Sequence, residues 1–194
     1  REKLGLVIGD IAGKGIAAAL LMANLQANLR SQCAIAGEPQ RFLESVNRLF
    51  YENTSDGAYA TLFFGEYDNT LRRLRYANCG HLSALLFRCD GSLEKLDSTA
   101  TVLGLFKTWN CAVAECHFFP GDTLVLYTDG VTESFNGRGD EFGEEGLIKA
   151  ARRHWELPPS RLLTSILDDV NRFSVQEQYD DITLVVARCR DAPD

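Results

Sequence analysis

Three aspartates stand where an apolar, strand-like segment meets a polar loop. They are Asp10, Asp129 and Asp180, and the last is followed directly by Asp181. The adjoining apolar runs are residues 4–8, 123–127 and 182–186. If the three strands are neighbours, their carboxylates converge, and their mutual repulsion favours the protonated form of each. A divalent cation removes that repulsion, and ligands that are all oxygen atoms select magnesium, manganese or calcium.

Each aspartate taken singly also has an ordinary structural explanation. Asp129-Gly130 is a typical turn sequence, and Asp10 has the position of a turn or helix-capping residue. Asp180 and Asp181 are harder to explain in this way, because two adjacent like charges bring no stability to the start of a strand. The joint pattern therefore indicates a metal site more strongly than any one of its members.

The glycine-rich segment 9–15 joins the first strand to a helix. It does not match the P-loop pattern G-x-x-x-x-G-K-[ST], because Ile8 replaces the first glycine and Gly15 replaces the serine or threonine. Gly13 and Lys14 nevertheless lead into a helix N-terminus, which is a favourable place for an anion. We therefore expect a phosphate group near a metal bound by the first aspartate.

Histidine and cysteine offer weaker candidates for chemistry. His81 lies between two strands and has the position of an acid, a metal ligand or a turn histidine, of which we favour the last. No G-x-S-x-G motif and no C-x-x-C pair occurs, so the six cysteines are interpreted as free, mostly buried thiols of a cytoplasmic protein. A zinc site from Cys111, Cys116 and His117 is disfavoured, because adjacent residues in a strand point to opposite faces.

The composition of the 194 residues is that of a folded globular protein, with 45% hydrophobic and 24% charged residues. The net charge is −7, and the one short basic cluster (Arg72, Arg73 and Arg75) is interpreted as a solvated face. This balance argues against a nucleic-acid-binding protein. The longest apolar stretch, 16–25, is interrupted by Asn24, so we expect no membrane span and no membrane contact.

The pattern of apolar residues predicts helices and strands that are segregated along the chain. Strands are predicted at 4–8, 59–67, 71–77, 83–88, 93–96, 111–119, 123–127 and 182–188. Helices are predicted at 16–34, 39–53, 144–153 and 159–174. This order favours an α+β fold over an alternating parallel sheet. The sequence begins inside a strand, from which we expect a fragment of a longer protein.

Seven segments follow one another along the chain in a recognisable order. They are GDIAGKGIAAALLMA, YATLFFGEYD, RYANCGH, LGLF, PGDTLVLYTDGVTESFN, EFGEEGL and YDDITLVV. In this order they resemble the PPM-type (protein phosphatase 2C-like) serine/threonine phosphatases. The resemblance is strongest to the bacterial branch of the sporulation stage II E protein and RsbU, and it covers nearly the whole chain.

The resemblance implies a four-layer α/β/β/α sandwich of two mainly antiparallel sheets, with a two-metal centre that binds Mn²⁺ or Mg²⁺. By this analogy Asp10 bridges the metals and the backbone carbonyl of Ile11 completes one site. Asp129 and Asp180 bind the other metal, and all three aspartates are catalytic. Residues expected to support the centre or contact phosphate are Gly13, Lys14, Gly130 and Asp181. The implied reaction is hydrolysis of phosphoserine or phosphothreonine by direct in-line attack of water.

Two departures from the family pattern bear on activity. The family's first strands carry a glycine-glycine-aspartate segment whose acid helps to bind one metal. This sequence begins after that point, so we expect one metal site to be incomplete. Ala12 stands where eukaryotic relatives place a histidine, as is common in the bacterial branch. We therefore interpret residues 1–194 as a single, N-terminally truncated phosphatase domain. The alternative is a catalytically impaired module that binds a partner without turnover.

The same resemblance predicts the cellular setting of the domain. The expected substrate is a phosphorylated anti-sigma-factor antagonist, and the expected regulator is a sensor domain earlier in the same chain. Residues 16–53 resemble the switch helices of the bacterial branch, and a homodimer is compatible with this arrangement. These expectations rest on analogy with the family alone.

Overall fold

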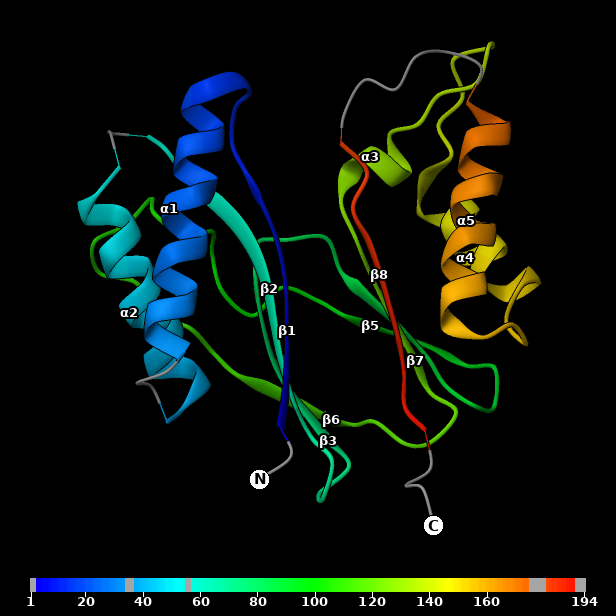
Figure 1. Cartoon of the computed structure of the whole chain (residues 1–194), viewed down its shortest axis with the longest axis horizontal. Helices are drawn as coiled ribbons and strands as arrows, with labels where there is room; N and C mark the ends of the chain where they lie inside the picture. The colour runs from blue at the N-terminus through cyan, green and yellow to red at the C-terminus, as the bar shows by residue number, and fades with distance from the viewer. Residues whose placement is uncertain (1–2, 34–36, 55–56, 175–180, 191–194) are drawn as a thin grey trace. The chain divides into compact units, whose positions relative to one another are not determined.

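The protein is seen in a computed structural model that describes residues 3–33, 37–54, 57–174 and 181–190. The chain forms two compact units, each built from two stretches of sequence. The first unit comprises Arg1–Ser83 and Leu96–Phe119, and the second comprises Ala84–Lys95 and Pro120–Asp194. Each unit contains one four-stranded sheet with helices packed against it (Figure 1).

The sheet of the first unit, sheet A, has the strand order β1-β2-β3-β6, and neighbouring strands are antiparallel. Its strands are β1 (Lys3–Ile11), β2 (Ala60–Asp68), β3 (Arg73–Cys79) and β6 (Ala114–His117). Two helices, α1 (Gly15–Cys33) and α2 (Pro39–Glu52), connect β1 to β2. They lie side by side against the sheet (Figure 1).

Helix α2 provides much of the core of the first unit. Pro39 starts it, because a fixed φ and a missing N–H suit the first helical position. The apolar side chains of Phe42, Val46 and Phe50 recur at helical spacing and are buried. The Phe42 ring lies 5.0 Å, centroid to centroid, from that of Phe64 on β2. Burying a side chain of this size contributes roughly 1.5–3 kcal/mol.

Asn47 ties α2 to the loop that precedes β6. Its side chain is buried among apolar residues, where an unpaired amide would be costly. The Nδ2 group donates to the Phe106 carbonyl at 3.1 Å, and Oδ1 accepts from the Gly104 N–H at 2.9 Å. Gly104 has φ +89°, and a Cβ there would lie 2.7 Å from a ring carbon of Phe50. The loop can therefore approach α2 this closely because residue 104 is glycine.

The strand predicted at 4–8 is present, but it is not buried as an apolar run of this kind suggests. β1 is longer than predicted, and it pairs with β2 along its whole length at the edge of the described sheet. Leu4 is 54% exposed and Val7 is 44% exposed, whereas Ile8 and Ile11 are buried. An apolar run does not show whether a strand lies at the edge or in the centre of a sheet, because strands in both positions contain the same residue types.

The second unit contains sheet B, with the strand order β5-β4-β7-β8. Its strands are β4 (Ala84–Phe87), β5 (Leu93–Leu96), β7 (Thr123–Tyr127) and β8 (Leu184–Arg188). Its helices are α3 (Asp129–Thr132), α4 (Gly143–Arg153) and α5 (Pro159–Phe173). Leu147 of α4, together with Leu162 and Ile166 of α5, packs with Leu85 and Val125 of the sheet in one buried cluster. β7 is buried along its whole length.

The predicted fold class, α+β with two mainly antiparallel sheets flanked by helices, is confirmed. The strand predicted at 111–119 is shorter, because β6 pairs with β3 only over Ala114–His117. Cys111 and Phe118 are buried next to β6 but do not pair in the sheet. Their burial accounts for the apolar sequence that suggested a longer strand. Helix α3 was not predicted. None of the described helices has the length and apolar character needed to cross a membrane.

Replacing Asn47 by alanine will destabilise the first unit. The Asn47→Ala variant leaves the Gly104 N–H and the Phe106 carbonyl without their partner, so we expect a loss of about 2–3 kcal/mol in unfolding free energy. Urea unfolding followed by circular dichroism measures this loss. The control is Arg48→Ala, an exposed position on the same helix, with an expected change within about 0.5 kcal/mol. Equal stability of the two variants would contradict the assignment.

Candidate metal centre

Asp10 stands at the end of β1, on a backbone that is held by its neighbours. The side chains of Ile8 and Ile11 are buried, whereas Asp10 is exposed. A Cβ at Gly9 would lie 2.8 Å from the Thr61 carbonyl oxygen, so glycine allows β1 to approach β2 here. The Asp10 Oδ1 atom accepts a hydrogen bond from the Ile11 N–H at 2.8 Å. The carboxylate is therefore oriented by the strand end and open to solvent.

The glycine-rich loop after Asp10 turns the chain into α1. Gly13 has φ +106° and Gly15 has φ +81°, which are left-handed conformations that favour glycine. α1 begins at Gly15, one residue earlier than predicted, and Lys14 is exposed just before it. The Ala12 N–H donates to the Tyr59 carbonyl at 3.0 Å, which fixes the start of the loop against β2. A helix N-terminus and a lysine thus lie within five residues of Asp10.

His81 belongs to the same end of sheet A as Asp10. The His81 N–H donates to the Asn78 Oδ1 at 2.8 Å, which makes the predicted turn after β3. The His81 Nδ1 lies 2.9 Å from the Thr61 hydroxyl. Thr61 is the cross-strand partner of Asp10, and directly opposed residues project from the same face of a sheet. The backbone of His81 belongs to the turn that we predicted. Its ring contacts Thr61, the cross-strand partner of Asp10, and the sequence alone did not predict this contact.

Asp129 occupies the corresponding place in the second unit. It follows the buried strand β7 and is the first residue of α3, where the sequence had suggested only a turn. A negative side chain is favoured in the first turn of a helix. The Gly130 carbonyl accepts from the buried Ser134 hydroxyl at 2.9 Å, which closes the segment after α3. Asp129 is half-buried, with its backbone fixed from both sides.

Thr128 joins the end of β7 to the segment that leads into β8. Its hydroxyl accepts from the Thr183 N–H at 2.9 Å and donates to the Asp181 carbonyl at 3.2 Å. The Thr128 N–H also donates to the Thr183 carbonyl at 3.1 Å. These three bonds hold Asp129 and the exposed Asp181 at the same end of sheet B, although 52 positions separate them in the sequence.

Tyr127 fixes this end of β7 to α4. Burial raises the pKa of the Tyr127 hydroxyl above its ordinary value, and the neighbouring Glu144 carboxylate raises it further. The hydroxyl therefore stays protonated and donates to Glu144 Oε2 at 3.2 Å. The same glutamate pairs with Lys95 of β5. The two residues that precede Asp129, Tyr127 and Thr128, are thus both held by side-chain hydrogen bonds.

The donor groups at these two strand ends suit a hard divalent cation. Asp10 and the Ile11 carbonyl in the first unit, and Asp129 and Asp181 in the second, offer only oxygen atoms. Among the described residues, no three His, Cys, Asp or Glu side chains gather as a ready metal site. The predicted ligand Asp180 lies outside those residues. Each strand end therefore fits Mn²⁺ or Mg²⁺ by its chemistry.

The family model for stage II sporulation protein E (SpoIIE) matches residues 1–190. This chain belongs to the SpoIIE family. The resemblance to protein phosphatase 2C-like proteins that the sequence motifs suggested is thereby confirmed. The match includes both strand-end aspartates of the described residues and the segment that contains Asp180.

Three proteins that are similar in sequence or fold are compared with this SpoIIE-family chain. Phosphoserine phosphatase RsbU of Bacillus subtilis (strain 168) is 28% identical over 97% of this chain and 56% of its own length. The crystal structure of the RsbU and RsbW domains of Rv1364c from Mycobacterium tuberculosis has a TM-score of 0.85 and 27% identity, covering 99% of this chain and 53% of that one. The present chain thus spans about half the length of these two relatives.

The third structure is the catalytic domain of the serine/threonine protein phosphatase PstP in complex with 2 manganese ions. It has a TM-score of 0.66 and 17% identity, and the match covers 96% of this chain and 88% of that one. At this identity the likeness concerns the fold. The α+β architecture of the SpoIIE-family chain is therefore that of solved phosphatase domains.

Removing the Thr128 hydroxyl will loosen the strand end that carries Asp129. In the Thr128→Val variant the shape is nearly kept, but two hydrogen bonds to the backbone are lost, so unfolding free energy falls by about 1–3 kcal/mol. Amide hydrogen exchange at Thr183 is expected to accelerate, because its N–H loses its acceptor. The matched control is Thr164→Val on the exposed face of α5. Unchanged exchange at Thr183 would show that the Thr128 hydroxyl does not hold the two segments together.

Proposed function

We propose that this chain hydrolyses phosphoserine or phosphothreonine on a partner protein in a metal-dependent reaction. The observation that carries the proposal is the placement of Asp10 and Asp129, each fixed at the end of a strand in a chain whose family match covers residues 1–190. Similarity to phosphoserine phosphatase RsbU supports the phosphoserine substrate. The manganese complex of PstP supports a divalent metal as cofactor.

We assign the metal ligands by the chemistry of the strand ends. Asp10 and the Ile11 backbone carbonyl would serve one site, and Asp129 and Asp180 would serve the other, with Asp181 beside it. Bound Mn²⁺ or Mg²⁺ would acidify water and neutralise the charge that develops on the phosphoryl group. Asp10, Asp129 and Asp180 are then the catalytic residues, because removing any of these carboxylates removes a ligand.

The residues around Asp10 suit the binding and orientation of a phosphate. The N-terminus of α1 presents backbone N–H groups without helical partners, and such ends attract anions. Lys14 is exposed next to this helix end, so its positive charge adds to the attraction. Gly130, the small residue beside Asp129, is buried in α3. Gly13 and Gly15 leave open space where side chains would stand. A phosphorylated side chain therefore has room to approach.

The partner is proposed to be a phosphorylated protein of the anti-sigma-factor-antagonist type. The support is the similarity to RsbU and to a chain that contains RsbU and RsbW domains. In this proposal residues 1–194 act as one cytoplasmic phosphatase domain that responds to a sensor domain of the same protein. The sensor domain and a homodimer are inferred from the family resemblance alone.

Replacing Asp129 by asparagine will abolish phosphate release. Asparagine keeps the shape and removes the charged ligand, so manganese-dependent hydrolysis of a phosphoseryl protein should fall at least about 100-fold. Phosphate release with and without MnCl₂ measures the effect. The control is Asp140→Asn in the exposed loop before α4, which should retain the parent activity.

The same experiment separates an enzyme from a non-catalytic phosphatase-fold module. Isothermal titration with MnCl₂ gives a readout besides activity, and Asp129→Asn should weaken manganese binding about 10-fold or more. If the parent chain binds manganese and a phosphorylated antagonist without releasing phosphate, the module is the better description. If the parent chain is active and the Asp129→Asn variant is equally active, the metal assignment fails.

A further inference from the structure

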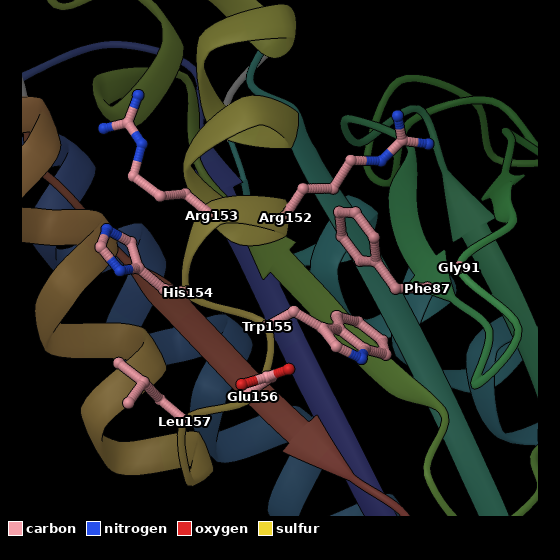
Figure 2. A pocket seen from close by; sticks show the side chains of 8 residues that line it. All are labelled: Phe87, Gly91, Arg152, Arg153, His154, Trp155, Glu156 and Leu157. Atoms are coloured by element: carbon pink, nitrogen blue, oxygen red, sulfur yellow. The ribbon is translucent and has the colours of Figure 1, made fainter.

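The second unit has a hollow at the C-terminal end of α4, at the opposite end of sheet B from Asp129. Residues 152–157, together with Phe87 of β4 and Gly91 of the β4–β5 turn, line a cavity of about 690 Å³ (Figure 2). We call it the α4–α5 hollow. Its lining combines aromatic rings with positively charged side chains. Nothing in the proposed phosphatase chemistry uses this combination.

Arg188 holds the floor of the hollow in place. Its guanidinium donates to the carbonyls of Trp155 at 2.7 Å and Leu157 at 2.9 Å, and to the Thr123 hydroxyl at 2.8 Å. It also lies 5.3 Å from the centre of the Trp155 ring, within cation–π range. The loop between α4 and α5 is therefore fastened to β7 and β8. A preformed loop loses little conformational entropy when it binds a ligand.

Trp155 presents an aromatic surface beside Phe87. The two ring centroids are 5.7 Å apart, and their planes are tilted by 51°. Trp155 is half-buried, so part of the indole is accessible from the hollow. Figure 2 shows the two rings next to each other, with the Arg152 side chain extending past Phe87. An apolar side chain placed here would contact two rings at once.

The charge around the rings is positive. Arg152, Arg153 and His154 line the hollow, and Glu156 supplies the one carboxylate of its lining. Arg153 and His154 bind Asp169 of α5 at 3.0 and 3.1 Å. Arg152 is exposed, and within the described part of the chain no carboxylate pairs with it. A chain with a net charge of −7 thus concentrates arginines beside an aromatic surface.

The α4–α5 hollow lies at the opposite end of sheet B from Asp129. Arg188 ends β8 and bonds to Thr123, the first residue of β7, whereas Asp129 lies two positions after Tyr127, the last residue of that strand. A strand of 5 residues spans roughly 17 Å. A ligand bound in the hollow would therefore not occupy the strand end that carries Asp129.

We propose that the α4–α5 hollow is a docking site for an acidic segment of a partner protein. An apolar or aromatic side chain of that segment packs on Trp155 and Phe87, and its carboxylates pair with Arg152. Arginine forms strong charge-assisted hydrogen bonds with carboxylates, and aromatic anchors flanked by arginine are typical of interaction hot spots. The hollow combines the exposed Arg152 with two aromatic rings, so a segment that carries carboxylates and one apolar side chain matches both features.

The two tryptophans of the chain provide a direct test by nitrogen–hydrogen correlation NMR. Each indole N–H gives one signal, and Trp109 is a buried internal control whose N–H donates to the Thr101 carbonyl in the first unit. The probe is the peptide acetyl-Glu-Glu-Phe-Glu-Glu-amide. We expect a saturable shift of the Trp155 signal and none of the Trp109 signal. Replacing the phenylalanine of the peptide by alanine should weaken binding about tenfold.

Charge reversal at matched positions makes the test specific. Arg152→Glu should weaken peptide binding at least about tenfold, because it places a negative charge against the ligand. Arg161→Glu, an exposed arginine of α5 outside the hollow, makes the same charge change and should leave binding within about twofold. Manganese-dependent phosphate release should be the same in both variants, so a failure of the proposed phosphatase activity would not be confused with a failure of docking.

Three results would overturn the docking proposal. One is the absence of a saturable Trp155 shift up to millimolar peptide. Another is equal weakening by Arg152→Glu and Arg161→Glu, which would mean that the overall charge acts instead of this site. The third is equally tight binding of acetyl-Lys-Lys-Phe-Lys-Lys-amide, which would show that the hollow does not select an acidic segment.

Discussion

The hydrogen bonds of Thr128 are the interaction on which the carboxylates of the second unit depend. Like charges separate unless a rigid frame or a cation holds them together. The Thr128 hydroxyl bridges the end of β7 and the segment before β8, so Asp129 and Asp181 share one end of sheet B. The frame is stiff because β7 is buried along its length and because Tyr127 is tied to Glu144. A metal site built here would use a geometry that folding has already fixed.

In the first unit, a different set of contacts positions the carboxylate. Asp10 is carried by the pairing of β1 with β2, and the close approach of the two strands requires Gly9. The Thr61–His81 hydrogen bond brings a second polar side chain to this strand end. Both units therefore use a strand as a rigid support and a glycine-containing loop as the open side. In the second unit the α4–α5 hollow lies at the other end of sheet B from Asp129.

The sequence predicted the elements well where periodicity was strong. The apolar positions of α2 and α5 recur at helical spacing, and the ends of both helices were predicted to within one residue. It was less successful where apolar residues are buried by loops. Cys111 and Phe118 resemble strand residues, yet they flank the short strand β6 without pairing in it. α3 was missed because a single helical turn after Thr128 has no periodicity to detect.

By itself the sequence determined the family, the fold class and the three candidate aspartates, because residue types at strand ends and the order of motifs are properties of the chain. It could not determine which distant residues share an end of a sheet. The Thr61–His81 contact depends on the β2–β3 register, and the Arg188 contacts depend on the packing of the α4–α5 loop against β8. Such contacts join residues that are 20 and 31 positions apart. Only tertiary structure decides them, since strand register and helix packing are set by burial of the whole core and not by local preference.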